Sequence, residues 1–143
     1  MQTLVVYSSR TGNTRKVAET IAAVFGVKAQ PCAGFQGIPE AGLLAVGSGV
    51  YGGRMDAGLA AFLERIPAGA VKKALVFGTI GSQTSAVEAI EKALEAKGIE
   101  VLGNFYCKGR FWFFLNRKHP NEQDLAAARE FALNIKRELE SGR

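Results

Sequence analysis

The chain has 143 residues, of which 48% are apolar and 22% are charged. These are ordinary values for one globular domain that buries a core, and they exclude a disordered tail and a coiled coil. The 18 Lys and Arg outnumber the 13 Asp and Glu and give a formal charge of +5, which by itself suggests nucleic acid, anionic lipid or an acidic partner.

Two further absences concern the location of the protein. No apolar run approaches the roughly 18 residues that a membrane span requires. The first residues carry neither a basic stretch nor the cleavage site of a secretory signal. We therefore expect a cytoplasmic protein.

Short apolar runs alternate with longer amphipathic stretches along the chain. The short runs are mostly apolar on both faces, as are strands of a parallel sheet covered by helices, and they span residues 4–7, 27–29, 43–46, 74–77 and 99–102. The amphipathic stretches carry apolar residues at helical spacing over 17–25, 59–66, 87–94 and 125–139. Residues 33–41 hold glycines and a proline, and we expect a loop or one short turn there. This alternation predicts one α/β domain over residues 1–143, layered around a parallel sheet.

A run of small polar residues joins the first predicted strand to the first helix, which begins near Asn13. A helix N-terminus favours anions because its first N–H groups lack helical partners and its dipole is positive there. Capping a helix needs one or two polar residues, so the longer run favours a phosphate site over a cap. The run matches neither G-x-x-x-x-G-K-[ST] nor G-x-G-x-x-G, which disfavours a nucleotide triphosphatase and a dinucleotide site. The sequence of this polar run is Ser8-Ser9-Arg10-Thr11-Gly12-Asn13-Thr14.

This run resembles the FMN-phosphate loop of the flavodoxin family, which is written (S/T)-x-T-G-x-T after the first strand. The resemblance implies a three-layer, doubly wound α/β fold with a five-stranded parallel sheet of order 2-1-3-4-5, in which FMN lies beyond strands 1 and 3. The chain length is similar to that of short-chain flavodoxins, which lack the insertion that splits the fifth strand. Arg10 stands where the family usually has a neutral residue, and it either reaches the phosphate or faces a partner. The residues that match the motif are Ser9, Thr11, Gly12, Asn13 and Thr14.

A glycine-rich stretch at 47–56 follows the third predicted strand. Four glycines let this loop wrap closely around a planar ligand. By resemblance, Tyr51 aligns with the aromatic residue that stacks on the flavin ring; the alternative is a surface Tyr in a flexible loop. Asp56 is expected to cap the next helix rather than to act as a catalytic acid. The resemblance implies cofactor contacts from Ser48, Gly49, Val50, Tyr51 and Gly52.

The second flavin loop of the family corresponds to residues 78–84. The resemblance implies backbone contacts from Thr79, Ile80 and Gly81. Unlike familiar flavodoxins, this stretch has no Tyr and no Asp or Glu. A carboxylate about 10 Å from the flavin would oppose formation of the anionic reduced flavin by roughly 1.7 kcal/mol, or about 70 mV for one electron. We therefore expect a less negative potential for the second electron than acidic flavodoxins have.

Residues 104–118 form a basic aromatic segment with four cations, no acid and six aromatic residues. Four interpretations stay open: core packing under the last helix, a lid or docking surface beside the flavin, contact with an anionic membrane, and binding of single-stranded nucleic acid. Core packing is the one we favour. We expect no nucleic acid, because the flavin motif already explains the chain.

The cysteines and the single histidine predict neither a disulfide nor a metal site. Cys32 follows the second predicted strand and Cys107 ends the fifth. These strands lie at opposite edges of a 2-1-3-4-5 sheet, roughly 19 Å apart at about 4.8 Å per strand, whereas a disulfide needs Cα atoms within about 7 Å. Two free thiols agree with a reducing cytoplasm. His119 has no Cys or acid at ligand spacing, so we expect no metal.

Taken with the resemblance, the sequence predicts an FMN-binding electron-transfer protein that shuttles electrons between redox partner proteins. The partner is expected to present an acidic face, because flavodoxins are usually acidic and this chain is basic. We expect a monomer that contacts neither nucleic acid nor membrane. The alternative is an FMN-dependent reductase or oxidase acting on a quinone or a porphyrin-type substrate. Residues 47–52 resemble the G-x-x-x-Y-G loop of menaquinone-dependent protoporphyrinogen oxidases, but the long late insertion of those enzymes is largely missing here.

Overall fold

The structure is a computed structural model that describes residues 2–8, 12–35, 37–38, 40–49, 56–80, 85–108 and 122–141. The strands are β1 (Thr3–Ser8), β2 (Ala29–Pro31), β3 (Ala41–Gly49), β4 (Val71–Ile80) and β5 (Glu100–Lys108). The helices are α1 (Asn13–Phe25), α2 (Ala57–Glu64), α3 (Ser85–Ala96) and α4 (Glu122–Glu140), with a single 3₁₀ turn, η1 (Cys32–Gly34). Each predicted strand and helix is present, in the predicted order, and the short turn overlaps the start of the predicted loop over residues 33–41.

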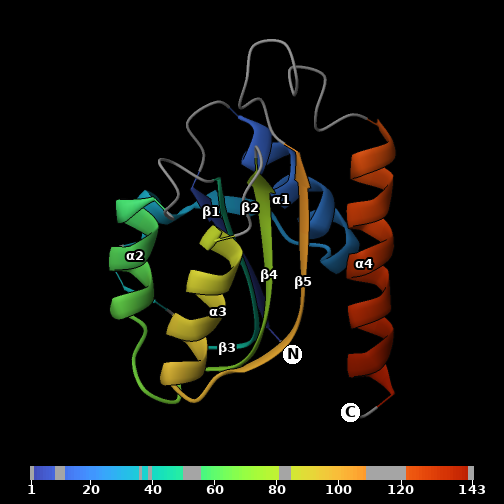
Figure 1. The fold of residues 1–143 in the computed structure, drawn as a ribbon. Coiled ribbons are helices and arrows are strands. Elements are labelled where there is room, and N and C mark those ends of the chain that lie inside the picture. The colour runs from blue at the N-terminus through green and yellow to red at the C-terminus, as the bar shows by residue number, and fades with distance from the viewer. Residues whose placement is uncertain are drawn as a thin grey trace.

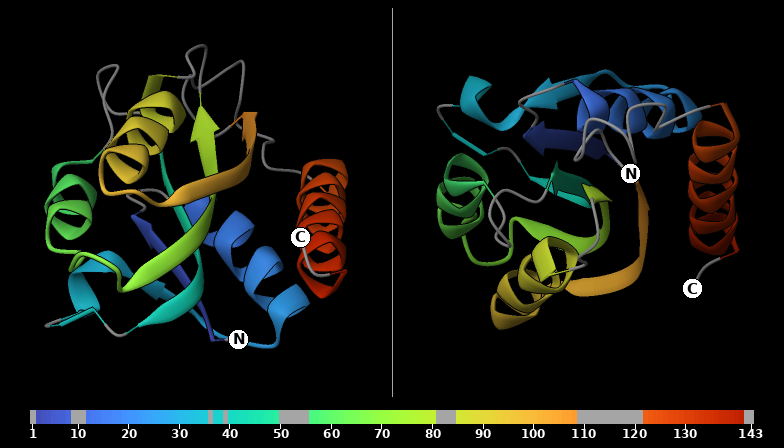
Figure 2. Two further views of the ribbon diagram at one scale, coloured as in Figure 1. Left: turned by 90° about the horizontal axis from the view of Figure 1, so that it is seen from below. Right: turned by 45° about the horizontal axis from the view of Figure 1, so that its top comes forward.

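The strands form one parallel sheet of order β2-β1-β3-β4-β5. Helices α1 and α4 lie side by side on one face, and α2 and α3 cover the other (Figures 1 and 2). This arrangement confirms the three-layer, doubly wound fold of order 2-1-3-4-5. The fifth strand runs through nine residues, so it is not split, as expected for a short chain.

Each face of the sheet has its own apolar core. Alternate residues of the central strands point to opposite faces, so Val6, Leu44 and Val76 pack beneath α2 and α3, whereas Val5 and Leu75 pack beneath α1 and α4. The central strands are therefore apolar on both faces, which explains why they appeared in the sequence as short continuous apolar runs.

Two strands begin later than the sequence predicted, and glycines explain both. Gly26 ends α1 with a φ of 70°, and the N–H of Val27 donates to the carbonyl oxygen of Ala22 at 3.1 Å. Gly98 after α3 has a φ of 76°, and Ile99 closes that helix in the same way. Because of these left-handed caps, the residue after each glycine is hydrogen-bonded to the last turn of the helix and not to a neighbouring strand. Strand β2 therefore begins at Ala29, not at residue 27, and β5 begins at Glu100.

Two lysines fasten helix C-termini from a neighbouring element. The Lys97 ammonium donates to the carbonyl oxygens of Glu64 and Ile66 at 2.7 and 2.8 Å, and the Lys136 ammonium donates to that of Val24 at 3.4 Å. A cation is favoured there because the last carbonyl groups of a helix lack helical partners. These bonds join α3 to α2 and α4 to α1, and so hold the outer layers together.

The ends of the central strands pack so closely that one position tolerates only glycine. Gly47 in β3 pairs with Tyr7 on one side and Phe77 on the other. A Cβ atom at Gly47 would overlap the ring of Phe77, which is fully buried. The aromatic ring thus occupies the space that a side chain on β3 would need, and it fixes the approach of β3 to β4 at the carboxyl edge of the sheet.

This packing predicts that Gly47→Ala destabilises the protein. We expect a loss of about 1–3 kcal/mol in the free energy of unfolding, because a fully buried ring must move. The matched control is Gly37→Ala, since a Cβ atom at Gly37 would meet nothing within 4 Å; it should change stability by less than about 0.5 kcal/mol. Urea unfolding of both variants measures the difference, and equal stabilities would contradict the packing argument.

Candidate functional site

The strands that precede the predicted loops end together at the carboxyl edge of the sheet. Ser8, the last residue of β1, pairs with Ser48 of β3, and Ser48 pairs with Gly78 of β4. The chain leaves β1 for α1 on one face and leaves β3 for α2 on the other (Figure 1). Ligands of open α/β sheets bind outside the carboxyl ends of the strands at such a switch point.

The structure describes only part of the predicted site. Gly12, Thr14, Ser48 and Gly49 are described in full, and all four lie at this edge. Asn13, Thr79 and Ile80 are described through their backbone. The remaining predicted contacts lie outside the described residues, and so do Arg54, His119 and most of the basic aromatic segment; these contacts are Ser9, Arg10, Thr11, Val50, Tyr51, Gly52 and Gly81.

The N-terminus of α1 differs in charge from those of the other helices. Gly12 occupies its N-cap with a φ of 86°, a conformation that favours glycine, and its first turn contains no acid. That turn instead includes Arg15 and Lys16. By contrast, α2 has an Asp N-cap, and the first turns of α3 and α4 contain acidic residues.

Cations in a first turn oppose the positive end of the helix dipole, whereas a bound anion would be attracted by both. Arg15 is balanced within its helix by Glu19, at 3.3 Å between Nε and Oε2, but both side chains are more than half exposed, so this pair contributes little. Thr14 is 1% exposed, which places its hydroxyl inside the junction between β1 and α1. The described start of α1 therefore has a charge distribution that favours an anion.

On the neighbouring strand, the Ser48 side chain is bonded within the protein. Ser48 is fully buried; its hydroxyl donates to the carbonyl oxygen of Gly49 at 2.7 Å and accepts from the backbone N–H of Asp56 at 3.2 Å. Asp56 in turn caps α2, because its Oδ2 accepts from the N–H of Gly58 at 3.0 Å. The prediction that Asp56 is an N-cap is confirmed.

A buried thiol that the sequence did not assign to the site lies beside this cap. Cys32 is 6% exposed and free. Burial raises the pKa of its thiol, and the negative charge of Asp56 raises it further, whereas a hydrogen bond from Ser8 acts in the opposite direction. Three segments distant in sequence meet here, so no local spacing could have revealed the contact. Burial and the Asp56 charge therefore favour the thiol form of Cys32 over the thiolate.

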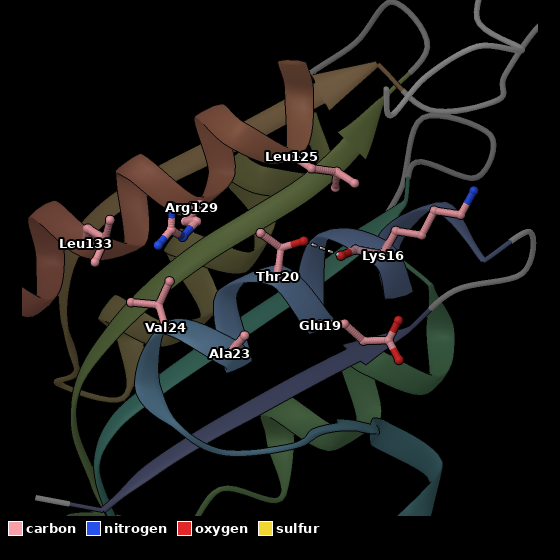
Figure 3. A pocket seen from close by; sticks show the side chains of 8 residues that line it. All are labelled: Lys16, Glu19, Thr20, Ala23, Val24, Leu125, Arg129 and Leu133. Carbon is pink, nitrogen blue, oxygen red and sulfur yellow. Dashed lines mark hydrogen bonds between the residues drawn. The ribbon is translucent and has the colours of Figure 1, made fainter. Parts of the chain in front are cut away.

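A groove of about 710 Å³ lies between α1 and α4, away from the predicted cofactor contacts (Figure 3). Leu125 and Leu133 of α4 line it, and both are only half-buried. Lys16, Thr20 and Arg129 add polar groups. The predicted apolar stripe of the last helix included Leu125 but not Leu133, and the partial exposure of Leu125 appears only once α4 is placed against α1.

Within the described ranges, no group of three or more His, Cys, Asp or Glu residues is arranged to hold a metal ion. Over the same part of the chain, no helix is both long enough and apolar enough to cross a membrane.

Comparisons with known proteins agree with this geometry. A family model described as a flavodoxin domain matches residues 4–117. The uncharacterized protein MJ0298 of Methanocaldococcus jannaschii is 34% identical over 152 residues, covering 94% of this chain and 98% of that protein.

Two solved structures show the same fold. A flavodoxin from the domain Archaea matches with a TM-score of 0.78 at 22% identity, over 98% of this chain and 99% of that one. Rubredoxin oxygen:oxidoreductase from Desulfovibrio gigas matches with a TM-score of 0.81 at 21% identity, over 98% of this chain but only 36% of that longer chain.

The surroundings of Cys32 predict its pH-dependent reactivity. The rate of alkylation by iodoacetamide at Cys32 should rise with pH around a midpoint above that of the unfolded chain, where a thiol has a pKa of about 8.5. Asp56→Asn removes the charge but retains a capping side chain, so it should lower the midpoint. Mass spectrometry of the Cys32 peptide gives the rate separately from that of Cys107.

The raised pKa of Cys32 also makes the free energy of unfolding depend on pH. As pH rises, the Cys32 thiol ionises in the unfolded chain before it ionises in the folded protein. The contribution of Cys32 to the free energy of unfolding is therefore complete below the ordinary thiol pKa, and it is lost as pH rises toward the raised pKa of the folded protein. Cys32→Ala should abolish this dependence. An alkylation midpoint for Cys32 at or below that of the unfolded chain would contradict the argument that burial raises the pKa of this thiol.

Proposed function

This chain belongs to the flavodoxin domain family and is a flavin-binding redox protein; on that premise we propose that it holds FMN non-covalently and carries electrons between redox partner proteins. The bound flavin would supply the redox chemistry. The residues of this chain would bind it, orient its ring and exclude water, with no side chain required as acid or base.

The observation that carries the proposal is the N-terminus of α1. Gly12 lets the backbone approach a ligand, the first turn holds Arg15 and Lys16 without an acid, and Thr14 is buried beside them. This donor set fits a phosphate dianion. By their match to the family motif, Ser9, Thr11 and Asn13 would complete the phosphate site.

The flavin ring would lie next to this phosphate site, between the segments that follow β3 and β4. By resemblance, Tyr51 would stack on the ring, a contact that contributes roughly 0.5–1.5 kcal/mol beyond the area it buries. Backbone groups of Thr79 and Gly81 would meet its edge. Support for this placement comes from the register, since Gly49 pairs with Thr79 where the two segments begin.

We expect the partner protein to present an acidic face. Six cations follow β1 or β3 in the chain or lie at or beyond the end of β5, and the carboxyl ends of these strands lie at the same edge of the sheet. An acidic partner would associate faster and bind more tightly at low salt, and the complex should weaken as ionic strength rises. The cations are Arg10, Arg54, Lys108, Arg110, Arg117 and Lys118.

The carrier is favoured over the quinone- or porphyrin-linked enzyme because β5 is continuous and the chain has little room for a substrate-binding insertion. Flavin-dependent oxidation of NAD(P)H or of a quinol without a second protein would favour the enzyme instead. A monomeric protein in the cytoplasm remains our expectation.

The phosphate assignment predicts the effect of removing two hydroxyl groups. Thr11→Ala combined with Thr14→Ala should weaken FMN binding by about 10²- to 10⁴-fold, because each hydrogen bond to a charged group is worth roughly 1.5–3 kcal/mol. Quenching of flavin fluorescence on titration of the apo-protein measures the affinity.

The matched control is Thr20→Ala on the same helix. Thr20 donates to the carbonyl oxygen of Lys16 at 3.0 Å and lies about two helical turns beyond Gly12, so its loss should leave FMN affinity unchanged. Because Thr14 is buried, urea unfolding should first establish that the double variant is folded. A folded double variant with unaltered FMN affinity would refute the phosphate site.

A further inference from the structure

We propose that the groove between α1 and α4 binds a short, acidic, amphipathic helix of a partner protein. The inference deepens the proposed function and rests on it, because it says where an acidic redox partner sits and which side chains that partner presents. The volume of the groove, about 710 Å³, is open to such a helix along two helices of this chain.

Apolar side chains line both walls of the groove and are only partly covered by the protein. Leu125 and Leu133 belong to α4 and Val24 belongs to α1, and all three are half-buried. The two leucines are about two helical turns apart, so the apolar part of the groove extends roughly 12 Å along α4. Two turns of a partner helix have this length, and the apolar residues of an amphipathic helix recur on one face at this spacing.

Two exposed cations stand on opposite walls of the groove. Lys16 comes from α1 and Arg129 from α4. Figure 3 shows Arg129 between Leu125 and Leu133 along α4. Among the residues that the structure describes, neither cation forms an ion pair. Carboxylates beside the apolar face of a partner helix would pair with both, and the arginine fork can bind a carboxylate through two hydrogen bonds.

The acidic residue Glu19 also lines the groove, but its charge is balanced within α1. Its Oε2 lies 3.3 Å from Nε of Arg15. In Figure 3 the Glu19 carboxylate points away from Arg129. The groove is therefore complementary in charge to an acidic helix and unfavourable for a basic one.

The position of the groove connects it with the proposed docking edge. Lys16 and Leu125 lie in the first turns of α1 and α4, at the end of the groove toward the carboxyl edge of the sheet (Figure 1). A helix in the groove would thus hold its protein beside the edge where we propose that the flavin binds. Complexes between electron-transfer proteins are small and weak, so one helix with two ion pairs is an adequate anchor for such a partner.

A peptide titration followed by fluorescence anisotropy tests the inference. The probe is a fluorescein-labelled helical peptide of about 14 residues, with leucines on one face and glutamates beside them. In about 0.15 M salt, Arg129→Glu should weaken its binding at least about tenfold, because an attraction becomes a repulsion. Leu133→Ala should weaken it about threefold to tenfold, because apolar contact area is lost. Lys16 is left unaltered, since it also belongs to the proposed phosphate site.

Arg137→Glu is the matched control for charge. Arg137 is exposed on the same helix but lies outside the groove lining, with its Nη1 at 3.8 Å from Oε1 of Glu130. It changes the net charge as much as Arg129→Glu does, and it should alter peptide affinity by less than about twofold because salt screens distant charges. Leu139→Ala is the control for Leu133→Ala, since Leu139 is half-buried on α4 but packs against the core.

Equal losses in Arg129→Glu and Arg137→Glu would overturn the inference, because the peptide would then respond only to net charge. Binding of phosphatidylglycerol vesicles that depends on Arg129, without binding of the peptide, would assign the groove to a membrane and overturn it as well. So would dimerisation that Leu133→Ala abolishes in sedimentation experiments, since a second copy of this chain would then occupy the groove.

Titration of the unaltered protein with FMN separates this inference from the proposed function. Binding of FMN without binding of the peptide refutes the inference alone. Binding of the peptide without binding of FMN refutes the proposed function and leaves the groove as a site for an acidic helix.

Discussion

Parallel pairing of β1 with β3 sets Ser8 opposite Ser48, and the chain leaves these strands toward opposite faces of the sheet. The start of α1 therefore lies at the same edge of the sheet as the end of β3. The close packing of Gly47 against the ring of Phe77 fixes β3 against β4 at the same level. The register of three strands thus brings the start of α1 and the ends of β3 and β4 together at the edge where we propose that the flavin binds.

Charge determines what this edge attracts. Helix α1 begins at a left-handed glycine with two cations in its first turn, whereas α3 begins with an acid and α2 is capped by Asp56. Dipole and side chains at α1 therefore favour a dianion together. The positive charge of the whole chain, which by itself suggested nucleic acid or lipid, serves in our proposal to dock an acidic partner protein.

The sequence predicted the elements well because apolar periodicity is a local property. It misplaced the starts of β2 and β5 because left-handed caps at Gly26 and Gly98 depend on hydrogen bonds back into the helix. The direction of the Ser48 hydroxyl and the burial of Cys32 beside Asp56 could not be predicted, since each joins segments that only the sheet topology brings together. The motif predicts a phosphate site before α1, but the charge contrast at α1 required all four helix starts to be located.

The most direct test compares FMN with riboflavin, which has the same ring but no phosphate. Titration of the apo-protein with each ligand, followed by fluorescence, gives both dissociation constants under identical conditions. We expect FMN to bind at least about 10³-fold more tightly, because several charge-assisted hydrogen bonds to the phosphate each contribute roughly 1.5–3 kcal/mol. Equal affinities for the two ligands would show that the N-terminus of α1 is not a phosphate site.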